Sequence, residues 1–160
     1  MSLANLQLAT MKMLAQQESL IHALYKQYED VFPEYADFWN DIAQDEMLHV
    51  RWIEALFQDV QEGTISFNVD RFAPDVLQKV KNYLQKEIQK AHKENISMAY
   101  ATTIAVDLEK SLLEKHFFTV YEGDAPGLRT TPDGLAKATE GHLEIVTRMW
   151  EKFNKRGEAS

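Results

Sequence analysis

Residues 35–56 read YADFWNDIAQDEMLHVRWIEAL, and their apolar side chains recur with the period of an α-helix. At alternating spacings of 4 and 3 residues, one face of this helix collects Tyr35, Trp39, Ile42, Glu46, His49, Ile53 and Leu56. Such a face is expected to be buried against a neighbouring helix. Because Glu46 and His49 interrupt it, the stretch predicts a helical protein with a polar site inside its core.

A matching stripe precedes this helix in the chain. It consists of Met11, Leu14, Glu18, Ile21, Tyr25, Tyr28 and Phe32. Pro33 disfavours helical backbone at Phe32, so we predict two long antiparallel helices over residues 3–31 and 34–61. Glu18 and Glu46 are both 14 residues from Phe32, or roughly 21 Å along their helices. The two carboxylates are therefore expected to face each other at one level.

The second half of the chain predicts another pair of helices. EGTISFNVDRFAP (62–74) indicates an extended crossover, followed by a shorter amphipathic helix from Pro74 to about residue 92. Ser97 is a candidate N-cap for a helix over 98–121, and EGDAPGLRT (122–130) predicts a loop. Thr131 and Pro132 begin the last helix, and Gly157 is expected to end it. Its stripe contains Leu135, Thr139, His142, Val146, Met149 and Phe153.

These elements predict an all-α protein of one domain, residues 1–160. Two antiparallel helical hairpins joined by a long crossover with an extra short helix are typical of a ferritin-like four-helix bundle. In the second hairpin, Glu109 and Thr139 are equidistant from residue 124, and His142 lies three residues beyond Thr139. Both hairpins thus repeat one plan. A helix with one Glu faces a partner helix that has a carboxylate position, followed three residues later by His.

Composition excludes several classes of function. The 160 residues are 45% hydrophobic and carry a net charge of −8, which argues against binding of nucleic acid. Without cysteine the chain has no disulfide, thiolate catalysis or sulfur-ligated metal site. We find no membrane-length apolar stretch and no secretory signal in MSLANLQLATMK, so a soluble, cytoplasmic protein is expected.

The chain resembles the rubrerythrin branch of the ferritin-like di-iron carboxylate proteins. The resemblance covers nearly the whole chain, through QQESLIHALYKQYEDVFPEYADFWNDIAQDEMLHVRWIEAL, AVDLEKSLLE and GLAKATEGHLEIV. It implies that iron is held by Glu18, Glu46, His49, Glu109 and His142. It also implies that Tyr25 hydrogen-bonds a ligand carboxylate and, more weakly, that Asp45 orients a histidine. A homodimer is a further implication.

Two positions depart from the family pattern. Thr139 stands where the last helix of the family carries a glutamate that bridges both metals. Three carboxylates then face two Fe(II), so the second iron is expected to bind more weakly or to recruit water, hydroxide or an outside anion. Glu140 points away from the stripe in a regular helix and reaches inward only through a π-bulge. Leu112 replaces a glutamate that shifts onto iron with redox state, which puts that exchange in doubt.

Other polar residues have simpler interpretations. A lone buried glutamate is commonly an acid satisfied by hydrogen bonds, and Tyr25 is equally compatible with plain core packing. His22 and His116 are more typical of core or edge histidines than of auxiliary ligands, and His92 is expected to face solvent. Gly141 either permits close approach to the metal centre or is merely tolerated in its helix.

Three functions remain open from sequence. The first is a non-haem di-iron oxidoreductase that reacts with peroxide or dioxygen, or oxidises Fe(II), and uses a separate electron donor because the chain has no cysteine for a rubredoxin-like module. The second is a degenerate site for a single metal at Glu18, Glu46 and His49. The third is a metal-free bundle with a structural or interaction role. Mn and Zn suit similar ligands.

Overall fold

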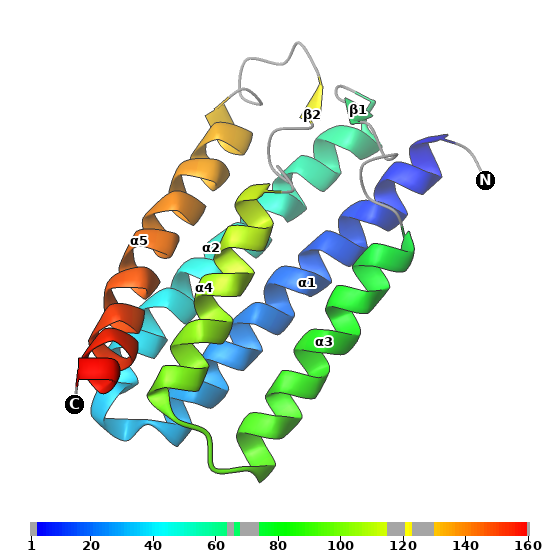
Figure 1. The fold of residues 1–160 in the computed structure, drawn as a ribbon. Coiled ribbons are helices and arrows are strands. Elements are labelled where there is room, and N and C mark those ends of the chain that lie inside the picture. Colours follow the sequence, from blue (N-terminus) through cyan, green and yellow to red (C-terminus); the bar gives the residue numbers. More distant parts are fainter. Residues whose placement is uncertain (1–2, 64–65, 68–73, 115–120, 123–129, 160) are drawn as a thin grey trace.

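The computed structural model describes the backbone of residues 3–63, 66–67, 74–114, 121–122 and 130–159, and side chains within 5–63, 75–111 and 140–154. These residues form an all-α protein whose long helices lie side by side (Figure 1). The helices are α1 (Leu3–Val31), α2 (Ala36–Gln61), α3 (Pro74–Lys93), α4 (Met98–Glu114) and α5 (Thr130–Ala159). A 3-10 helix η1 (Pro33–Tyr35) and the two-residue strands β1 (Ser66–Phe67) and β2 (Tyr121–Glu122) complete the described elements.

The first hairpin forms where the proline predicts it. α1 ends at Val31, and Phe32 takes the extended φ of −120° that a residue before proline favours. The N–H of Tyr35 then donates to the carbonyl of Phe32 at 2.9 Å, which closes the short turn into α2. α2 therefore begins at Ala36 and returns antiparallel along α1 (Figure 1).

The predicted stripes are the buried faces of this hairpin. Every member of the first stripe except Phe32 is buried, and every member of the second except Tyr35 is buried; these two aromatic residues are partly buried beside the turn. Trp39 lies at the centre, within 4.8 Å of the Tyr28 ring and 5.8 Å of the Tyr25 ring between centroids. Tightly packed aromatic rings thus fill the end of the hairpin next to η1.

α4 and α5 form the second antiparallel pair. The hydroxyl of Ser97 accepts the N–H of Tyr100 at 3.0 Å, which confirms Ser97 as the N-cap of α4. The Trp150 indole donates to Thr103 at 2.9 Å and joins α5 to α4. The Trp39 indole donates to the Met98 sulfur at 3.4 Å and joins the second pair to the first.

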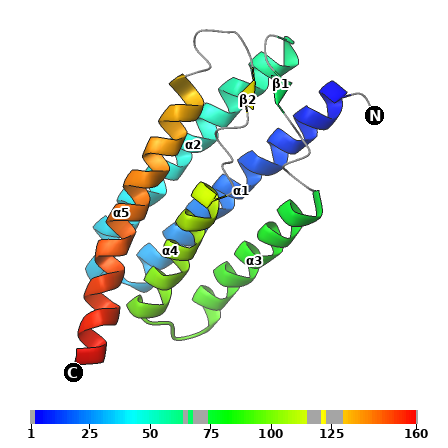
Figure 2. The ribbon, with the colours of Figure 1, turned by 45° about the horizontal axis from the view of Figure 1, so that its top comes forward.

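α3 confirms the helix predicted from Pro74 to about residue 92. It spans 20 residues and lies along the outside of α1 (Figure 2). Leu77, Leu84 and Ala91 on its inner face are buried in the common core. The apolar stripe runs the full length of the helix, so every turn buries an apolar side chain, and this favours a helix of the predicted length.

The C-terminal ends of two helices were predicted wrongly. Helix 98–121 was expected to include Tyr121, but the described part of α4 ends at Glu114 and Tyr121 pairs with Phe67 in an antiparallel ladder. Aromatic residues favour such pairing as readily as a helix, so composition alone did not separate the two outcomes. Gly157 was expected to end the last helix, yet α5 continues to Ala159, since one glycine costs a helix only about 1 kcal/mol. None of the helices within the described ranges combines the length and the hydropathy that a membrane-spanning segment needs.

Candidate metal centre

Glu46 lies at the middle of a cluster of buried carboxylates and imidazoles. Its side chain is fully buried, and those of Glu18, His49, Glu109 and His142 are at most 4% exposed. α1 contributes Glu18, α2 contributes Glu46 and His49, α4 contributes Glu109 and α5 contributes His142. All five predicted ligands therefore come together, although 124 residues separate the first from the last.

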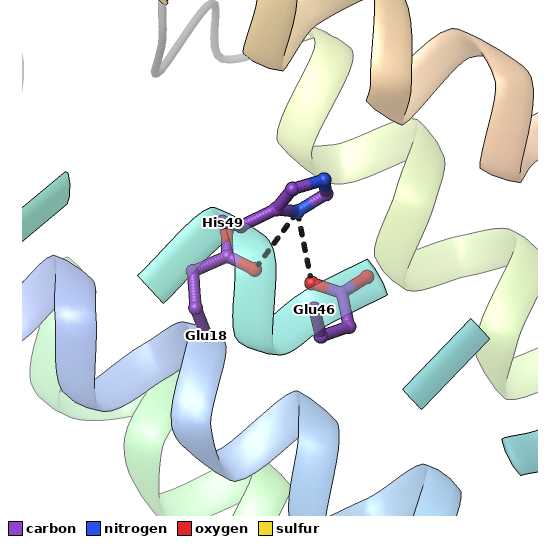
Figure 3. Close-up of side chains that lie close together, drawn as sticks. All are labelled: Glu18, Glu46 and His49. Atoms are coloured by element: carbon purple, nitrogen blue, oxygen red, sulfur yellow. Dashed lines mark hydrogen bonds and ion pairs between the residues drawn. The ribbon is translucent and has the colours of Figure 1, made fainter. Parts of the chain in front are cut away.

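One half of the cluster connects α1 with α2 (Figure 3). Nδ1 of His49 lies 3.2 Å from Oε2 of Glu46 and 3.6 Å from Oε2 of Glu18. Both carboxylates point toward the imidazole from opposite helices, as their equal distance from Phe32 predicts. One ligand atom from each of these three residues lies within 4.8 Å of the others, which is a spacing that one metal ion can span.

The other half connects α2 with α4 and α5. Nδ1 of His142 lies 3.2 Å from Oε1 of Glu46 and 3.7 Å from Oε1 of Glu109. Glu46, Glu109 and His142 form a second group with ligand atoms within 4.8 Å of one another. Glu46 thus belongs to both groups and presents a different oxygen to each histidine. The two imidazole rings stack with centroids 5.2 Å apart.

Tyr25 and Asp45 contact the group of Glu46, Glu109 and His142. The Tyr25 hydroxyl donates to Oε1 of Glu109 at 3.0 Å, across the interface between α1 and α4. Oδ2 of Asp45 lies 3.0 Å from Nε2 of His142, the ring nitrogen that faces away from Glu46. A carboxylate on the far nitrogen of a histidine fixes the orientation and tautomer of the ring, which is a common arrangement around metal-ligating histidines.

Burial and the neighbouring charges shift the pKa values of three groups in the cluster. Burial, with the nearby Glu46 carboxylate, raises the pKa of Glu18 to about 8. Burial lowers the pKa of His49, but its contacts with Glu18 and Glu46 outweigh this and raise it to about 10. The contacts of His142 with Glu109 and Glu46 likewise outweigh burial and raise its pKa to about 11. Without a metal, the nearby carboxylates therefore favour the protonated form of both imidazoles.

Two buried carboxylate oxygens of the cluster are available to bind a cation. Within the described residues, Oε2 of Glu18 and Oε2 of Glu109 have no hydrogen-bond partner. An unsatisfied buried carboxylate oxygen is costly, and a cation bound at that oxygen removes the cost. Carboxylate oxygen together with imidazole nitrogen is a donor set that suits Fe, Mn and Zn. The residues present therefore fit a divalent metal in each half of the cluster.

The remaining candidate residues lie outside the cluster or beyond the described side chains. His22 is half-buried and donates from Nδ1 to the Ala43 carbonyl at 2.7 Å, in agreement with a structural histidine. His92 is exposed at the end of α3, as predicted. The side chains of Leu112, His116 and Thr139 lie outside the part that the structure describes.

Glu140 does not take the position of the missing glutamate. α5 is a regular α-helix from Thr130 to Ala159, and the Glu140 side chain is exposed. The π-bulge that would turn it inward is therefore not present. Gly141 does not permit a close approach either, because a Cβ built there meets no heavy atom within 4 Å.

A pocket beside the two histidines was not predicted from sequence. It lies between α2 and α5, and its lining includes Leu48, Trp52 and Ile145. Trp52 follows His49 by three residues and Ile145 follows His142 by three, so each continues the face of its histidine by one turn. The spacing of three residues after each histidine is therefore the sequence signal that could have placed Trp52 and Ile145 beside the cluster.

Comparisons of this chain with protein-family models, curated proteins and solved structures find no match.

Proposed function

We propose that this chain is a di-iron carboxylate protein with a ferritin-like four-helix bundle of the rubrerythrin type. In this proposal Glu18, Glu46 and His49 hold one iron, while Glu46, Glu109 and His142 hold the other. The observation that carries the proposal is the position of Glu46, whose two oxygens each lie 3.2 Å from a different histidine. A single carboxylate that faces two histidine-containing groups is the arrangement expected of a bridging ligand.

The proposed activity is reduction of peroxide or dioxygen, or oxidation of Fe(II), with electrons from a separate donor. When bound, the two irons supply the electrons for this chemistry. The protein contributes fixed ligand positions in a poorly solvated environment, because all five ligand side chains are at most 4% exposed. Tyr25 and Asp45 hold Glu109 and His142 in place through contacts of 3.0 Å each.

A second candidate is a site that holds a single metal. One observation favours it: among the described side chains of α5, His142 alone belongs to a candidate ligand group, and the Glu140 side chain is exposed. Three carboxylates leave two divalent cations with an excess positive charge, so the second ion needs water, hydroxide or an outside anion to complete its shell. The group of Glu18, Glu46 and His49 has two carboxylates of its own and is the expected position of a lone metal.

Anaerobic loading with Fe(II), followed by hydrogen peroxide or dioxygen, tests the proposed activity. Protein-bound iron is expected to be oxidised faster than Fe(II) in buffer, and Glu46→Ala is expected to abolish the difference. Glu140→Gln is the matched control, because it removes an exposed carboxylate close to His142 and should leave the rate unchanged. Equal rates with wild-type protein and with buffer would contradict the proposal.

A further inference from the structure

The pocket between α2 and α5 leads from the surface to the two histidines. It has a volume of about 270 Å³, and we name it the α2/α5 pocket. Leu48, Trp52 and Ile145 form its apolar wall, the buried His49 and His142 form its polar floor, and the half-exposed Asp45 lies beside them. The floor consists of side chains that belong to the candidate metal centre or contact it directly.

The apolar wall is partly open to solvent. Leu48 is 43% exposed and Ile145 is 47% exposed, and both lie at this one pocket. Trp52 stacks on the His49 ring with centroids 6.0 Å apart, so its indole connects the rim with the floor. Apolar side chains that line a concave site beside a few convergent polar groups are typical of a small-molecule site.

Gly141 keeps this pocket wide. It lines the pocket on the α5 side, immediately before His142, and a Cβ built there meets no heavy atom within 4 Å. Packing therefore does not require glycine at this position, and a helix generally favours alanine. What glycine does provide is space in the pocket next to the imidazole of His142.

The size and polarity of the pocket define what it can hold. An apolar cavity of about 150 Å³ accommodates benzene, so the α2/α5 pocket has room for one ring with a short substituent. An apolar body gains free energy by leaving water for the wall of Leu48, Trp52 and Ile145, whereas hydrogen peroxide has no such body.

We infer that the α2/α5 pocket binds small organic hydroperoxides, with the apolar body against Leu48, Trp52 and Ile145 and the peroxide end toward His49 and His142. This inference rests on the proposed function and specifies its substrate class. In the overall reaction the O–O bond of the hydroperoxide breaks as it takes up two electrons and two protons, which yields an alcohol and water. The electrons come from two Fe(II), each oxidised to Fe(III).

A titration with cumyl alcohol tests binding without any chemistry at iron. This alcohol is the stable product of cumene hydroperoxide and keeps its shape, so it serves as the probe. The indole N–H signals of the three tryptophans report its position in NMR spectra. The Trp52 signal is expected to shift saturably, while those of Trp39 and Trp150, which donate to Met98 and Thr103, are expected to stay in place.

Two variants locate the binding site. Gly141→Leu fills the α2/α5 pocket and is expected to weaken binding of cumyl alcohol at least tenfold. Ala15→Leu is the matched control, because it places the same leucine side chain in a different groove, between α1 and α2, that Met11, Ile53 and Phe57 line. It is expected to leave binding unchanged. A smaller loss in Gly141→Leu, an equal loss in Ala15→Leu, or a Trp52 signal that does not shift would overturn the inference.

Kinetics with iron-loaded protein separate this inference from the proposed function. The ratio of the oxidation rate constants with cumene hydroperoxide and with hydrogen peroxide should fall at least tenfold in Gly141→Leu, because only the organic peroxide uses the apolar wall. An unchanged ratio would overturn the substrate assignment while iron binding stands. Failure to bind iron would overturn the proposed function, whereas the cumyl alcohol titration would still decide whether the pocket takes an organic ligand.

Discussion

Oε1 of Glu46 lies 3.2 Å from Nδ1 of His142, a residue 96 positions later in the chain. The other oxygen of the same carboxylate lies 3.2 Å from Nδ1 of His49, one turn away on α2. Glu46 therefore joins the two helical pairs through a buried polar contact. The expected effects of substitution at the site follow from this shared position and from the residues that support it.

Tyr25→Phe is expected to destabilise the protein by about 1–3 kcal/mol, because it leaves a buried oxygen of Glu109 without its 3.0 Å donor. It should also lower the affinity for the metal held by Glu109 and His142 by about 10–100-fold, which is the usual effect of removing a hydrogen bond to a metal ligand. Urea denaturation and metal titration measure the two effects. Tyr28→Phe is the matched control, since the Tyr28 hydroxyl is buried without a hydrogen-bond partner among the described residues. An equal loss in both variants would show that the contact with Glu109 is unimportant.

Thr139→Glu is expected to raise the occupancy of the second metal. Position 139 lies one turn before His142 on α5, so a glutamate there adds a fourth carboxylate on the face of the site. Metal analysis after loading with limiting Fe(II) measures the change. Thr139→Gln, which has the same length but no charge, should leave occupancy at the wild-type value. An unchanged occupancy in Thr139→Glu would refute the assignment of this position.

Metal affinity is expected to rise with pH. Without metal the pKa values of Glu18, His49 and His142 are about 8, 10 and 11, so all three groups are largely protonated at pH 7. A metal must displace these protons, and its apparent affinity should increase as pH rises through 7–9. Calorimetry in buffers with different ionisation enthalpies should detect release of more than one proton per metal-loaded chain. Binding without proton release would contradict the charge state described for the cluster.

Stability of the metal-free protein should show the opposite trend. Each of the three pKa values is raised above its ordinary value of 4.5 for Glu or 6.5 for His. Their contribution to the free energy of unfolding is therefore complete below those ordinary values and is lost as pH rises through the raised ones. For Glu18 this loss falls between about pH 4.5 and 8, and Glu18→Gln should remove it. Denaturation curves at several pH values without metal give the comparison.

Gly141→Ala is expected to stabilise α5 by up to about 1 kcal/mol, because alanine favours the helix and the added Cβ meets no neighbour within 4 Å. Chemical denaturation measures the gain. Gly63→Ala supplies the contrast: Gly63 has a φ of +78°, where an added side chain is strained, so that variant should lose stability. Loss of stability in Gly141→Ala would indicate that the position serves packing rather than space in the pocket.

Much of the site could be predicted from residue spacing because helices convert spacing into position. Glu18, Glu46 and His49 meet because α1 and α2 are straight helices joined by a short turn at Pro33, so counting from Phe32 gives the level of each side chain. Tyr121 was harder to place, since its local propensity does not reveal its pairing with the distant Phe67. Gly157 was harder to place because a single glycine costs a helix only about 1 kcal/mol. The α2/α5 pocket depends on how two helices of different pairs lie beside each other, which no single stripe specifies.

The count of metal ions per chain in wild-type protein and in three variants tests the central role of Glu46 most directly. After anaerobic loading with Fe(II) and removal of free metal, we expect about two irons per chain in wild type and about one each in Glu18→Gln and Glu109→Gln. Glu46→Ala is expected to hold none, because it removes a ligand from both groups. A wild-type protein without iron above background, or a Glu46→Ala variant that retains the wild-type amount, would contradict a centre built around this shared carboxylate.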